Sequence, residues 1–547
     1  MTRFKKFISI MTSTTLLLSG TIATTSFAVS PEGNFLNTFS SERKMNEYLE
    51  LNTNGVLEET IDVTTLDFYQ ACPYTNNQTK APLPASVDLS TSPCFPPLGN
   101  QSSLGSCTAF ATTYYQFSYE VNKMNNITSV NDQVVYSPKC VYNNLNEGDT
   151  DGIAVSDAYV YLNNFGALKE NELPYDGNYT YIPGNLLDST DEMIDEKIEA
   201  LKTRVSGMGV LTLPDTGTCI TSPTDADLNA IKSMINDGKI LVITTKTSFN
   251  RKNGFGAYSN LSICYRSYTA SSGGHAMAVV GYDDNICCDV NGNGTIEECE
   301  KGAFKLANSY GTSIDNSGYK WVLYDAINAV SANVTNDWES KLSGTRYQAL
   351  RFSYPQPTFW YIYVENKDVN YIGEINLNTN YYDYLNIQIS RTTSNTSNPI
   401  YTNSIKPRIS SLTRQYTGKI LFDYDSYCYP ITNYLSGYKW YVKLSPYSGD
   451  SLNARFRIID DKENEIIGYE SENSIMALSN EKYKIINTKI GDMNYNGIWD
   501  REDATIIQNN LLGNISISTL QEKLVDANQN GSIDLADAVH ILMNLEG

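Results

Sequence analysis

Residues 490–547 contain an internal repeat. The sequence Asp-Met-Asn-Tyr-Asn-Gly at 492–497 recurs as Asp-Ala-Asn-Gln-Asn-Gly at 526–531, and each copy is followed by an apolar run with helical spacing. Oxygen-bearing side chains at positions 1, 3 and 5 and a glycine at position 6 are typical of a calcium loop, because Ca²⁺ prefers oxygen ligands and the loop turns sharply at the glycine. The repeat therefore predicts a small α-helical module with two calcium loops.

The rest of the chain must hold further domains. It has 547 residues, whereas one domain usually has about 100–200. A hydrophobic content of 41% is ample for sizeable cores. The formal net charge of −21 argues against nucleic acid or an anionic membrane surface as a partner.

Residues 1–28 are expected to be a signal peptide. Arg3, Lys5 and Lys6 precede a short apolar run, and Ser-Phe-Ala at 26–28 fits a small-x-small cleavage site. A membrane anchor is the alternative, but the run is short and broken by Ser and Thr. Elsewhere the sequence lacks the ~20 consecutive apolar residues that a spanning helix needs. We therefore expect a secreted, extracellular protein without a membrane span in the mature chain.

Two further regions are distinguished by their amino-acid composition and pattern. Residues 29–82 are polar and are interpreted as a pro-segment or leader, with one helix over 40–51. Residues 351–485 alternate short, tyrosine-rich β-prone runs with Asn, Ser and Gly turns, which predicts an all-β accessory domain of the sandwich type. Its aromatic side chains could bind sugar rings, but cross-strand pairs and core packing account for them more simply.

Residues 83–350 alternate helical and strand-like runs and predict an α+β domain. A helix is expected over 107–121, where apolar or small residues recur every three or four positions. Strands are expected over 240–245, 276–282 and 319–324.

This α+β domain contains the groups that thiol catalysis needs. Cys107 lies at the start of the predicted helix, where the helix dipole and free N–H groups favour a thiolate. Gln101 lies on the preceding loop and can join the Cys107 N–H in an oxyanion hole. The chain has two histidines, and His540 lies in the C-terminal module, so an imidazole base in this domain must be His275. Asn308 can fix the tautomer of that imidazole without taking a proton.

Four motifs together resemble the papain family of cysteine peptidases, and they occur in the family's order. They are Leu-Pro-Ala-Ser-Val-Asp at 83–88, Gln101 with Gly-Ser-Cys at 105–107 and Ala-Phe at 109–110, Gly-His-Ala at 274–276, and Asn-Ser at 308–309. The resemblance covers roughly residues 83–330.

The resemblance implies a papain-like α+β fold and cysteine endopeptidase activity. It implies the nucleophile role for Cys107 and the acid/base role for His275. It also implies that Asn308 orients the imidazole and that Gln101 donates to the oxyanion.

The sequence also departs from the family pattern. Leu104 stands where a disulfide-forming cysteine is usual, and Thr108 replaces an aromatic residue. Tyr310 and Ile314 stand where the family has tryptophans, and Asp-Gly at 151–152 replaces a Gly-Gly pair that commonly binds substrate backbone. These changes alter the packing around the catalytic residues. The chain has ten cysteines, and their connectivity stays open, as sequence alone does not determine it.

An insertion between His275 and Asn308 fits a third calcium loop. Its sequence over 289–300 matches the EF-hand pattern through the final glutamate. The expected ligands are Asp289, Asn291, Asn293, the carbonyl of Thr295, Glu297 and Glu300. An acidic surface loop is the alternative. We expect the ion to fix the chain between the two strands that carry His275 and Asn308.

The C-terminal repeat resembles a dockerin, a module with paired EF-hand-like loops that each precede a helix and end in Asp. Its expected ligands are Asp492, Asn494, Asn496, Ile498, Asp500 and Asp503 in the first loop, and Asp526, Asn528, Asn530, Ser532, Asp534 and Asp537 in the second. The resemblance implies two calcium ions and a cohesin on a scaffolding protein as partner, as in cellulosomes. The alternative is a calcium buffer or stabilising clip.

The sequence thus predicts a secreted papain-like endopeptidase tethered to a cohesin-bearing scaffold. Two rivals stay open: a papain-like module that binds proteins without cutting them, and a thiol hydrolase of cell-wall peptides.

Overall fold

The computed structural model divides the chain into two units, residues 1–45 and 46–547. The described residues all belong to the second unit. They are 55–56, 62–73, 82–146, 152–176, 193–212, 226–246, 249–267, 274–327, 358–369, 371–379, 386–392, 402–404, 416–424, 439–445, 451–459, 465–470, 475–476, 482–487, 490–493, 499–517 and 524–545. The expected signal peptide, the expected helix over 40–51 and the ligands Asn494, Asn496 and Ile498 lie outside them. Within these residues, no helix is both long and apolar enough to cross a membrane.

One long helix crosses the α+β domain. It consists of α3 (Cys107–Ala109), a π-helical stretch (Phe110–Phe117) and α4 (Ser118–Met124). The side chains from Cys107 through Thr113 are all buried, so this part has no solvent face. Its polar members bond locally, as Thr112 Oγ1 does to the Thr108 carbonyl (2.8 Å). The helix expected over 107–121 is therefore present and continues to residue 124.

The remaining helices of this domain are shorter. They are α5 (Pro138–Leu145), α6 (Val155–Phe165), α7 (Ile194–Leu201), α8 (Ala226–Asn236) and α9 (Tyr324–Ile327), with single 3₁₀ turns at Val63–Thr65, Leu89–Thr91, Val130–Asp132, Gly256–Tyr258 and Glu298–Glu300.

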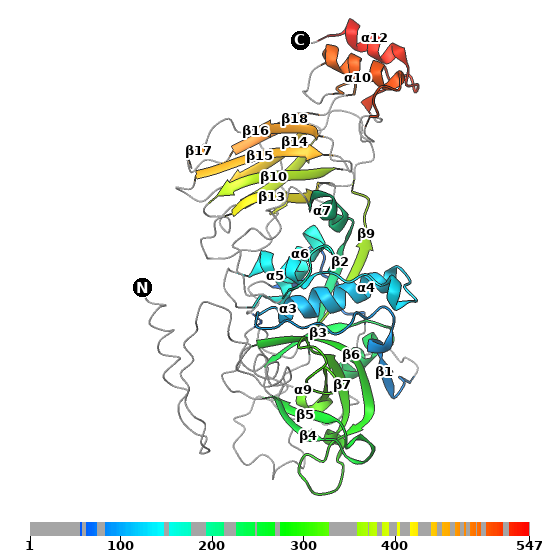
Figure 1. The fold of residues 1–547 in the computed structure, drawn as a ribbon, viewed down its shortest axis with the longest axis vertical. Helices are drawn as coiled ribbons and strands as arrows, with labels where there is room; N and C mark the ends of the chain where they lie inside the picture. Colours follow the sequence, from blue (N-terminus) through cyan, green and yellow to red (C-terminus); the bar gives the residue numbers. More distant parts are fainter. Residues whose placement is uncertain are drawn as a thin grey trace. The chain divides into compact units, whose positions relative to one another are not determined.

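A nine-stranded sheet forms the second part of the domain (Figure 1), in the order β2-β9-β3-β6-β7-β8-β5-β4, with β1 paired to β6. The strands are β1 (Ser86–Asp88), β2 (Thr203–Thr212), β3 (Leu241–Lys246), β4 (Phe249–Asn253), β5 (Ser262–Ser267), β6 (Gly274–Cys287), β7 (Lys301–Ala307), β8 (Tyr319–Leu323) and β9 (Thr358–Asn366). The three expected strands correspond to β3, β6 and β8, and β6 is longer than expected. Among these pairs only β5 with β8 is parallel.

The β6–β7 hairpin determines where the site forms. These strands pair antiparallel with Ala278 opposite Ala307. His275 near the start of β6 and Asn308 directly after β7 therefore lie at the same end of the hairpin. The insertion at 289–300 connects the two strands at the other end.

Strand β9 lies beyond the expected boundary at residue 350. It pairs with β2 along its length and with β3 through Phe359 and Trp360, both of which are buried. The sheet of the α+β domain therefore extends to residue 366.

The described residues between 371 and 487 form strands and no helix. One sheet has the order β13-β10-β15-β16, with β17 paired to β15, and the other has the order β12-β11-β14-β18. The strands are β10 (Ile372–Thr379), β11 (Asn386–Thr392), β12 (Thr402–Ser404), β13 (Tyr416–Asp423), β14 (Lys439–Ser445), β15 (Ser451–Ile459), β16 (Glu465–Glu470), β17 (Ile475–Met476) and β18 (Lys482–Asn487).

The C-terminal region contains helices α10 (Arg501–Leu511) and α12 (Leu535–Met543), which contact each other. Asp500 and Asp534 cap their N-termini, each in a reciprocal capping box with the aspartate three residues later.

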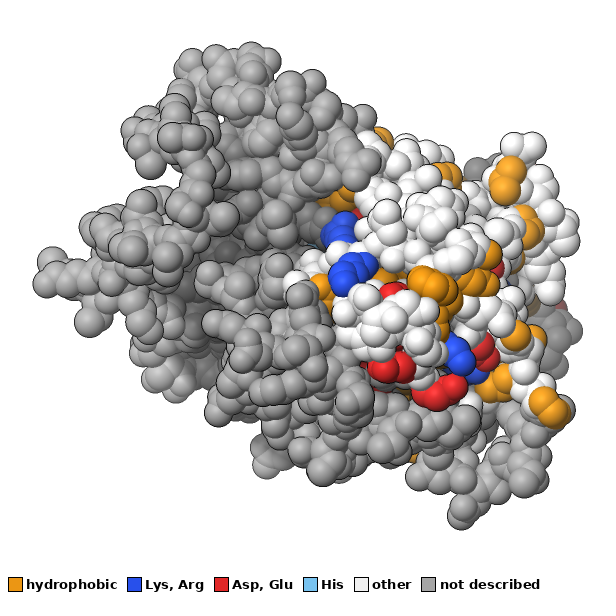
Figure 2. All heavy atoms as spheres, turned by 90° about the horizontal axis from the view of Figure 1, so that it is seen from below, with side chains coloured by type: hydrophobic (Ala, Val, Ile, Leu, Met, Phe, Trp, Pro, Cys, Tyr) orange, Lys and Arg blue, Asp and Glu red, His pale blue; other side chains and the backbone are white. Residues whose placement is uncertain are grey.

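The face shown in Figure 2 carries few charged side chains among its described residues. Basic, acidic and apolar side chains are scattered over a surface that is mostly uncharged and polar. No extended patch of one charge sign covers the described part of this face.

Candidate active site

Cys107 is the first residue of α3 and is completely buried. Its Sγ accepts the N–H of Ala276 (3.3 Å), the residue after His275. Burial raises the pKa of the thiol to about 12, although N–H groups of Ala276 and Thr108 act against this shift. The helix terminus alone therefore does not produce a thiolate in this form of the protein, because the sulfur is sealed from water.

The leader supplies the cover over Cys107. A Cβ on Gly55 would lie 2.1 Å from Cys107 Sγ, so only a glycine fits against the sulfur. The Gly55 N–H donates to the Gly274 carbonyl (3.0 Å), and Thr108 Oγ1 donates to the Gly55 carbonyl (2.8 Å). One backbone–backbone hydrogen bond and one hydrogen bond from the Thr108 hydroxyl thus hold Gly55 against Cys107.

Residues 55–56 continue along residues 152–153. Val56 forms a parallel bridge with Ile153, and a Cβ on Gly152 would lie 2.0 Å from the Gly55 carbonyl carbon. Gly152 therefore permits close approach of the chain at residues 55–56.

His275 lies on β6 and is buried beside Asn308. Its Nε2 is 2.8 Å from Asn308 Oδ1, and Tyr310 stacks on the imidazole with 5.8 Å between ring centroids. Burial lowers the pKa of His275 to about 4, against the effect of the Asn308 hydrogen bond. The imidazole is therefore neutral near pH 7 in this form.

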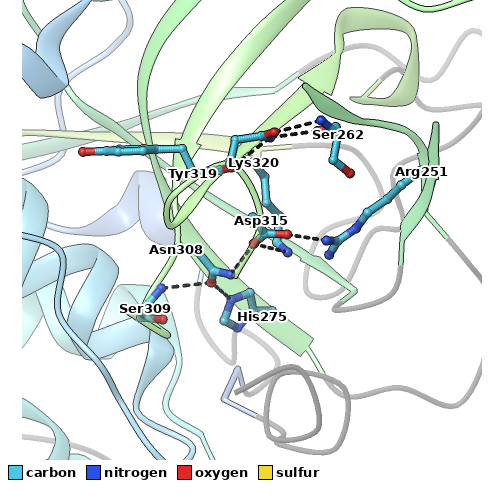
Figure 3. Close-up of polar contacts among 9 residues, drawn as sticks. Arg251, Ser262, His275, Asn308, Ser309, Asp315, Tyr319 and Lys320 are labelled. Carbon is cyan, nitrogen blue, oxygen red and sulfur yellow. Dashed lines mark hydrogen bonds and ion pairs between the residues drawn. The ribbon is translucent and has the colours of Figure 1, made fainter. Parts of the chain in front are cut away.

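Asn308 is fixed on both sides of its side chain (Figure 3). Its Oδ1 accepts the N–H of Ser309 (2.9 Å) as well as facing His275, and its Nδ2 donates to Asp315 Oδ2 (3.0 Å). Its backbone carbonyl accepts Tyr115 Oη (2.7 Å).

Gln101 is buried and is linked to the same segment. Its N–H donates to the Ser309 carbonyl (2.7 Å), and its Oε1 accepts the Ser309 hydroxyl. Its Nε2 donates to the Leu104 carbonyl (2.9 Å), which leaves one of the two amide hydrogens for another acceptor. The fold thus joins Gln101 to the Asn308 segment through Ser309.

Several functional contacts were missed by the sequence reasoning. Gly55 covers the thiol, Ser309 connects Gln101 to Asn308, and Asp315 holds the Asn308 amide. Nothing in the local sequence points to Asp315, because its partners are set by the packing of separate strands. The Gly-Val pair at 55–56 also has no distinguishing motif.

The insertion and the second C-terminal loop share one hydrogen-bond pattern. Asp289 accepts from Gly294 N (2.8 Å) as Asp526 accepts from Gly531 N (2.9 Å). Glu300 at the last position accepts from Glu297 N (3.0 Å), and the last residue of the second loop, Asp537, accepts from Asp534 N (2.9 Å). Both loops have the oxygen donors that suit a hard cation such as Ca²⁺.

The asparagine side chains of these two loops share a further hydrogen-bond pattern. Asn291, Asn293, Asn528 and Asn530 each accept a backbone N–H two residues later. In the first C-terminal loop Asp492 and Asp503 are buried, and Asp503 accepts from Met493 N and Asp500 N. Within the described residues, no three His, Cys, Asp or Glu side chains converge as a metal cluster.

Among the described residues, free thiols are found at Cys94, Cys107, Cys140, Cys287 and Cys288.

Comparison with known proteins gives a family match. Residues 83–337 match the family described as papain family cysteine protease. Xylellain, a cysteine protease from Xylella fastidiosa, is 20% identical with a TM-score of 0.36, over 57% of this chain and 96% of its own. Procathepsin B S9 from Trypanosoma congolense is 17% identical with a TM-score of 0.37, over 59% of this chain and 89% of its own. No curated protein matches the chain.

Proposed function

We propose, from the premise that residues 83–337 form a papain family cysteine protease domain, that this cysteine peptidase is an endopeptidase acting through Cys107, His275 and Asn308. One arrangement carries the proposal. Cys107 Sγ touches the backbone N–H next to His275, while Asn308 Oδ1 lies 2.8 Å from Nε2 of the same imidazole. Nδ1 of His275 is thereby left for the thiol.

In the proposed reaction, His275 takes the proton of Cys107 and the thiolate attacks the substrate carbonyl carbon. The Cys107 N–H and the free side-chain N–H of Gln101 stabilise the oxyanion. The imidazolium then protonates the leaving amine, which leaves a thioester on Cys107. Water, deprotonated by His275, hydrolyses this thioester and restores the thiol.

We further propose that residues 29–82 are an inhibitory pro-segment. The contacts of Gly55 with Cys107, Gly274 and Thr108 support this role, because they occupy the space from which a substrate carbonyl must approach the sulfur. Removal of the leader would return the thiol to water and lower its pKa.

The test uses residues 29–547 expressed with calcium, before and after removal of residues 29–82, beside a Cys107→Ala control. Cleavage of a peptide library and a covalent adduct with a thiol reagent are both measured. Both signals should appear after leader removal and be absent from Cys107→Ala. An adduct without peptide cleavage would favour a hydrolase of another acyl substrate. Neither signal would favour a binding module and overturn the proposal.

We propose calcium as the ligand of three loops, at 289–300, 492–503 and 526–537. The shared hydrogen-bond pattern of the two fully described loops supports one chemistry for both. Isothermal titration of the chelator-treated chain with Ca²⁺ should give three sites. Loss of one site in Asp289→Ala and of another in Asp526→Ala would assign them, and an unchanged titration would contradict the assignment.

The C-terminal helices are proposed to bind a cohesin domain on a scaffolding protein. Leu535, Val539, Leu542 and Met543 of α12 are exposed, with Met543 79% accessible, and such apolar side chains on one short helix suit a protein partner. A panel of purified cohesins should include one that binds with calcium. Val539→Asp should abolish this binding while leaving peptidase activity unchanged, and equal binding by both forms would contradict the proposal.

Export is proposed from the expected signal peptide at 1–28. N-terminal sequencing of the protein from culture medium should begin at Val29 or within the leader. Retention of the whole chain in the cells would contradict export.

A further inference from the structure

A buried ion-pair network lies behind Asn308 (Figure 3). Asp315 is on the turn between β7 and β8, and its side chain is 2% exposed. It pairs with Nζ of Lys320 (2.9 Å), whose side chain is completely buried, and with the guanidinium of Arg251 from β4. A carboxylate this deep in the protein is stable only with such partners.

The turn that carries Asp315 is held in a costly conformation. Asp315 has a φ of 53°, in the left-handed region that few residues other than glycine adopt. The next residue, Asn316, ties the turn to β5 by accepting Ser262 N (2.8 Å) and donating to the Ser262 carbonyl (2.8 Å). This fixed turn directs the carboxylate at the Asn308 amide.

The hydrogen bond from Asn308 to Asp315 has a consequence for His275. An ionised carboxylate only accepts hydrogen bonds, so Asn308 must present its NH₂ group to Asp315 and its Oδ1 to His275. A neutral imidazole facing an oxygen must then carry its proton on Nε2. Nδ1 is thereby the basic nitrogen.

We propose that Asp315 is a positioning residue that fixes the orientation of the Asn308 amide and, through it, the tautomer of His275. This inference rests on the Cys107, His275 and Asn308 site proposed above. Ser309 N donates to Oδ1 of Asn308 and so supports the same amide orientation from the other side. Among the described residues, Asp315 is the charged group that bonds to this amide.

The charges around His275 come from several elements. Asp315 acts to raise its pKa and Lys320 acts to lower it. Arg251 approaches from β4 on the far side of Asp315, and Cys107 comes from α3. Removal of the Asp315 charge therefore takes away a negative charge that favours the imidazolium required in the proposed reaction and leaves the opposing effect of Lys320.

Asp315→Asn tests the proposal because it keeps the shape and removes the charge. Arg251 donates to Oδ1 of Asp315, whereas Lys320 and Asn308 both donate to Oδ2. The amide that replaces this carboxylate would offer a single uncharged oxygen to these three donors, so the acceptor for the NH₂ group of Asn308 would be weakened. The preference of Asn308 for presenting Oδ1 to His275, and with it the preference for the proton on Nε2, should therefore decrease. Asp88→Asn is the matched control, because Asp88 pairs with Lys305 on β7 (2.8 Å) away from Asn308.

The first readout is the histidine tautomer in the pro-form, by ¹⁵N NMR of histidine-labelled protein in a Cys107→Ala background near pH 7. The chain has two histidines, so a His540→Gln variant assigns the signals. Nε2–H should dominate in the parent and in Asp88→Asn, and its share should fall in Asp315→Asn. An unchanged share of the Nε2–H tautomer in Asp315→Asn would overturn the proposal. This readout does not depend on turnover and so stands apart from the test of peptidase activity.

The second readout is kcat/KM against pH for the leader-free enzyme, normalised to titrated active sites. The alkaline limb of this profile reports deprotonation of the imidazolium, and its apparent pKa should fall by about 0.5–1 pH unit in Asp315→Asn. The value of kcat should fall about 10- to 100-fold, while KM should change little. Asp315→Glu should restore part of the activity. If Asp315 has only a structural role, Asp315→Asn should lower the fraction of active sites that titrate without moving the alkaline limb of the kcat/KM profile. That result would also contradict the proposal.

If Asp315→Asn does not fold, Arg251→Gln provides an alternative test of the role of Asp315. The Arg251 side chain is 31% exposed, so its replacement is better tolerated than a change at Lys320. Loss of this cation leaves the Asp315 charge less compensated, and the alkaline limb should move up. An unmoved limb would overturn the proposal.

Discussion

Gly55 and Cys107 show how one residue controls the state of another. The thiol has the helix N-terminus that stabilises a thiolate, yet burial raises its pKa to about 12. Gly55 contributes to this burial, and its fit depends on the missing side chain. The thiol is therefore protonated near pH 7 although Cys107, His275 and Asn308 lie together.

Gly55→Val should weaken this cover. A Cβ at residue 55 overlaps the sulfur, and overpacking of this kind costs about 1–3 kcal/mol, so the open form should become about 5- to 150-fold more populated. The iodoacetamide alkylation rate of the pro-form at pH 7.5 measures the change. Ala71→Val, at an exposed leader position, should alkylate at the parent rate. Equal rates for all three proteins would show that Gly55 does not seal the thiol.

The buried neutral His275 should make the pro-form less stable in acid. Its pKa is lowered from 6.5 to about 4 by burial, so the unfolded chain takes up the proton at a higher pH than the folded chain. The stability that it contributes is complete above about pH 6.5 and is lost as the pH falls to about 4, a loss of about 3 kcal/mol. Urea unfolding of the Cys107→Ala pro-form between pH 7 and 4 measures this slope. His275→Gln should flatten it, and identical slopes would contradict the prediction.

At the scale of elements, the β6–β7 hairpin connects the insertion to the site. His275 and Asn308 lie at one end of the paired strands, and residues 289–300 close the other. The carboxylate of Glu300 accepts hydrogen bonds from Val290 N (2.7 Å) and Glu297 N, which close the loop on itself. An ion in this loop would stabilise the strand pairing that aligns His275 with Asn308.

Asp289→Ala should therefore lower thermal stability. Loss of the first ligand should remove the stabilisation by calcium and lower the Tm in calcium by about 3–8 °C, with a smaller loss after chelation. Glu298→Ala is the matched control, because Glu298 is exposed in the same loop and pairs only with Lys301. Differential scanning calorimetry with and without chelator gives both values. Equal Tm values for the two variants would exclude this role for Asp289.

At the scale of the molecule, the α+β domain needs a strand that follows the family match. The match ends at residue 337, whereas β9 (Thr358–Asn366) inserts between β2 and β3. Phe359, Trp360, Tyr361 and Ile362 are all buried there. The folding unit is therefore longer than the sequence motifs indicate.

Truncation tests this extension. A chain of residues 29–350 loses four buried apolar side chains, each worth about 1.5–3 kcal/mol, and exposes the edges of β2 and β3. It should be largely insoluble, while residues 29–369 should be soluble and cooperative in thermal unfolding. Soluble yield and calorimetry compare the two. A stable 29–350 protein would show that β9 is dispensable.

The sequence by itself located the candidate groups of this protein wherever the signal is local. The helix beginning at Cys107, the strand that begins near His275 and the regular oxygen positions of the loop at 289–300 follow from residue type and spacing, because helix caps, strand periods and loop positions lie within about a dozen residues. The match of residues 83–337 to the papain family cysteine protease model agrees with the resemblance carried by such motifs in order.

Only the tertiary structure determined the contacts that control this chemistry. Gly55 meets Cys107, Asp315 meets Arg251 and β9 enters the sheet across separations that no periodicity encodes. Buried charge pairs and close backbone approaches depend on how whole elements pack. The pKa values of Cys107 and His275 likewise depend on that packing, since exclusion of water is a property of the assembled fold and not of any segment.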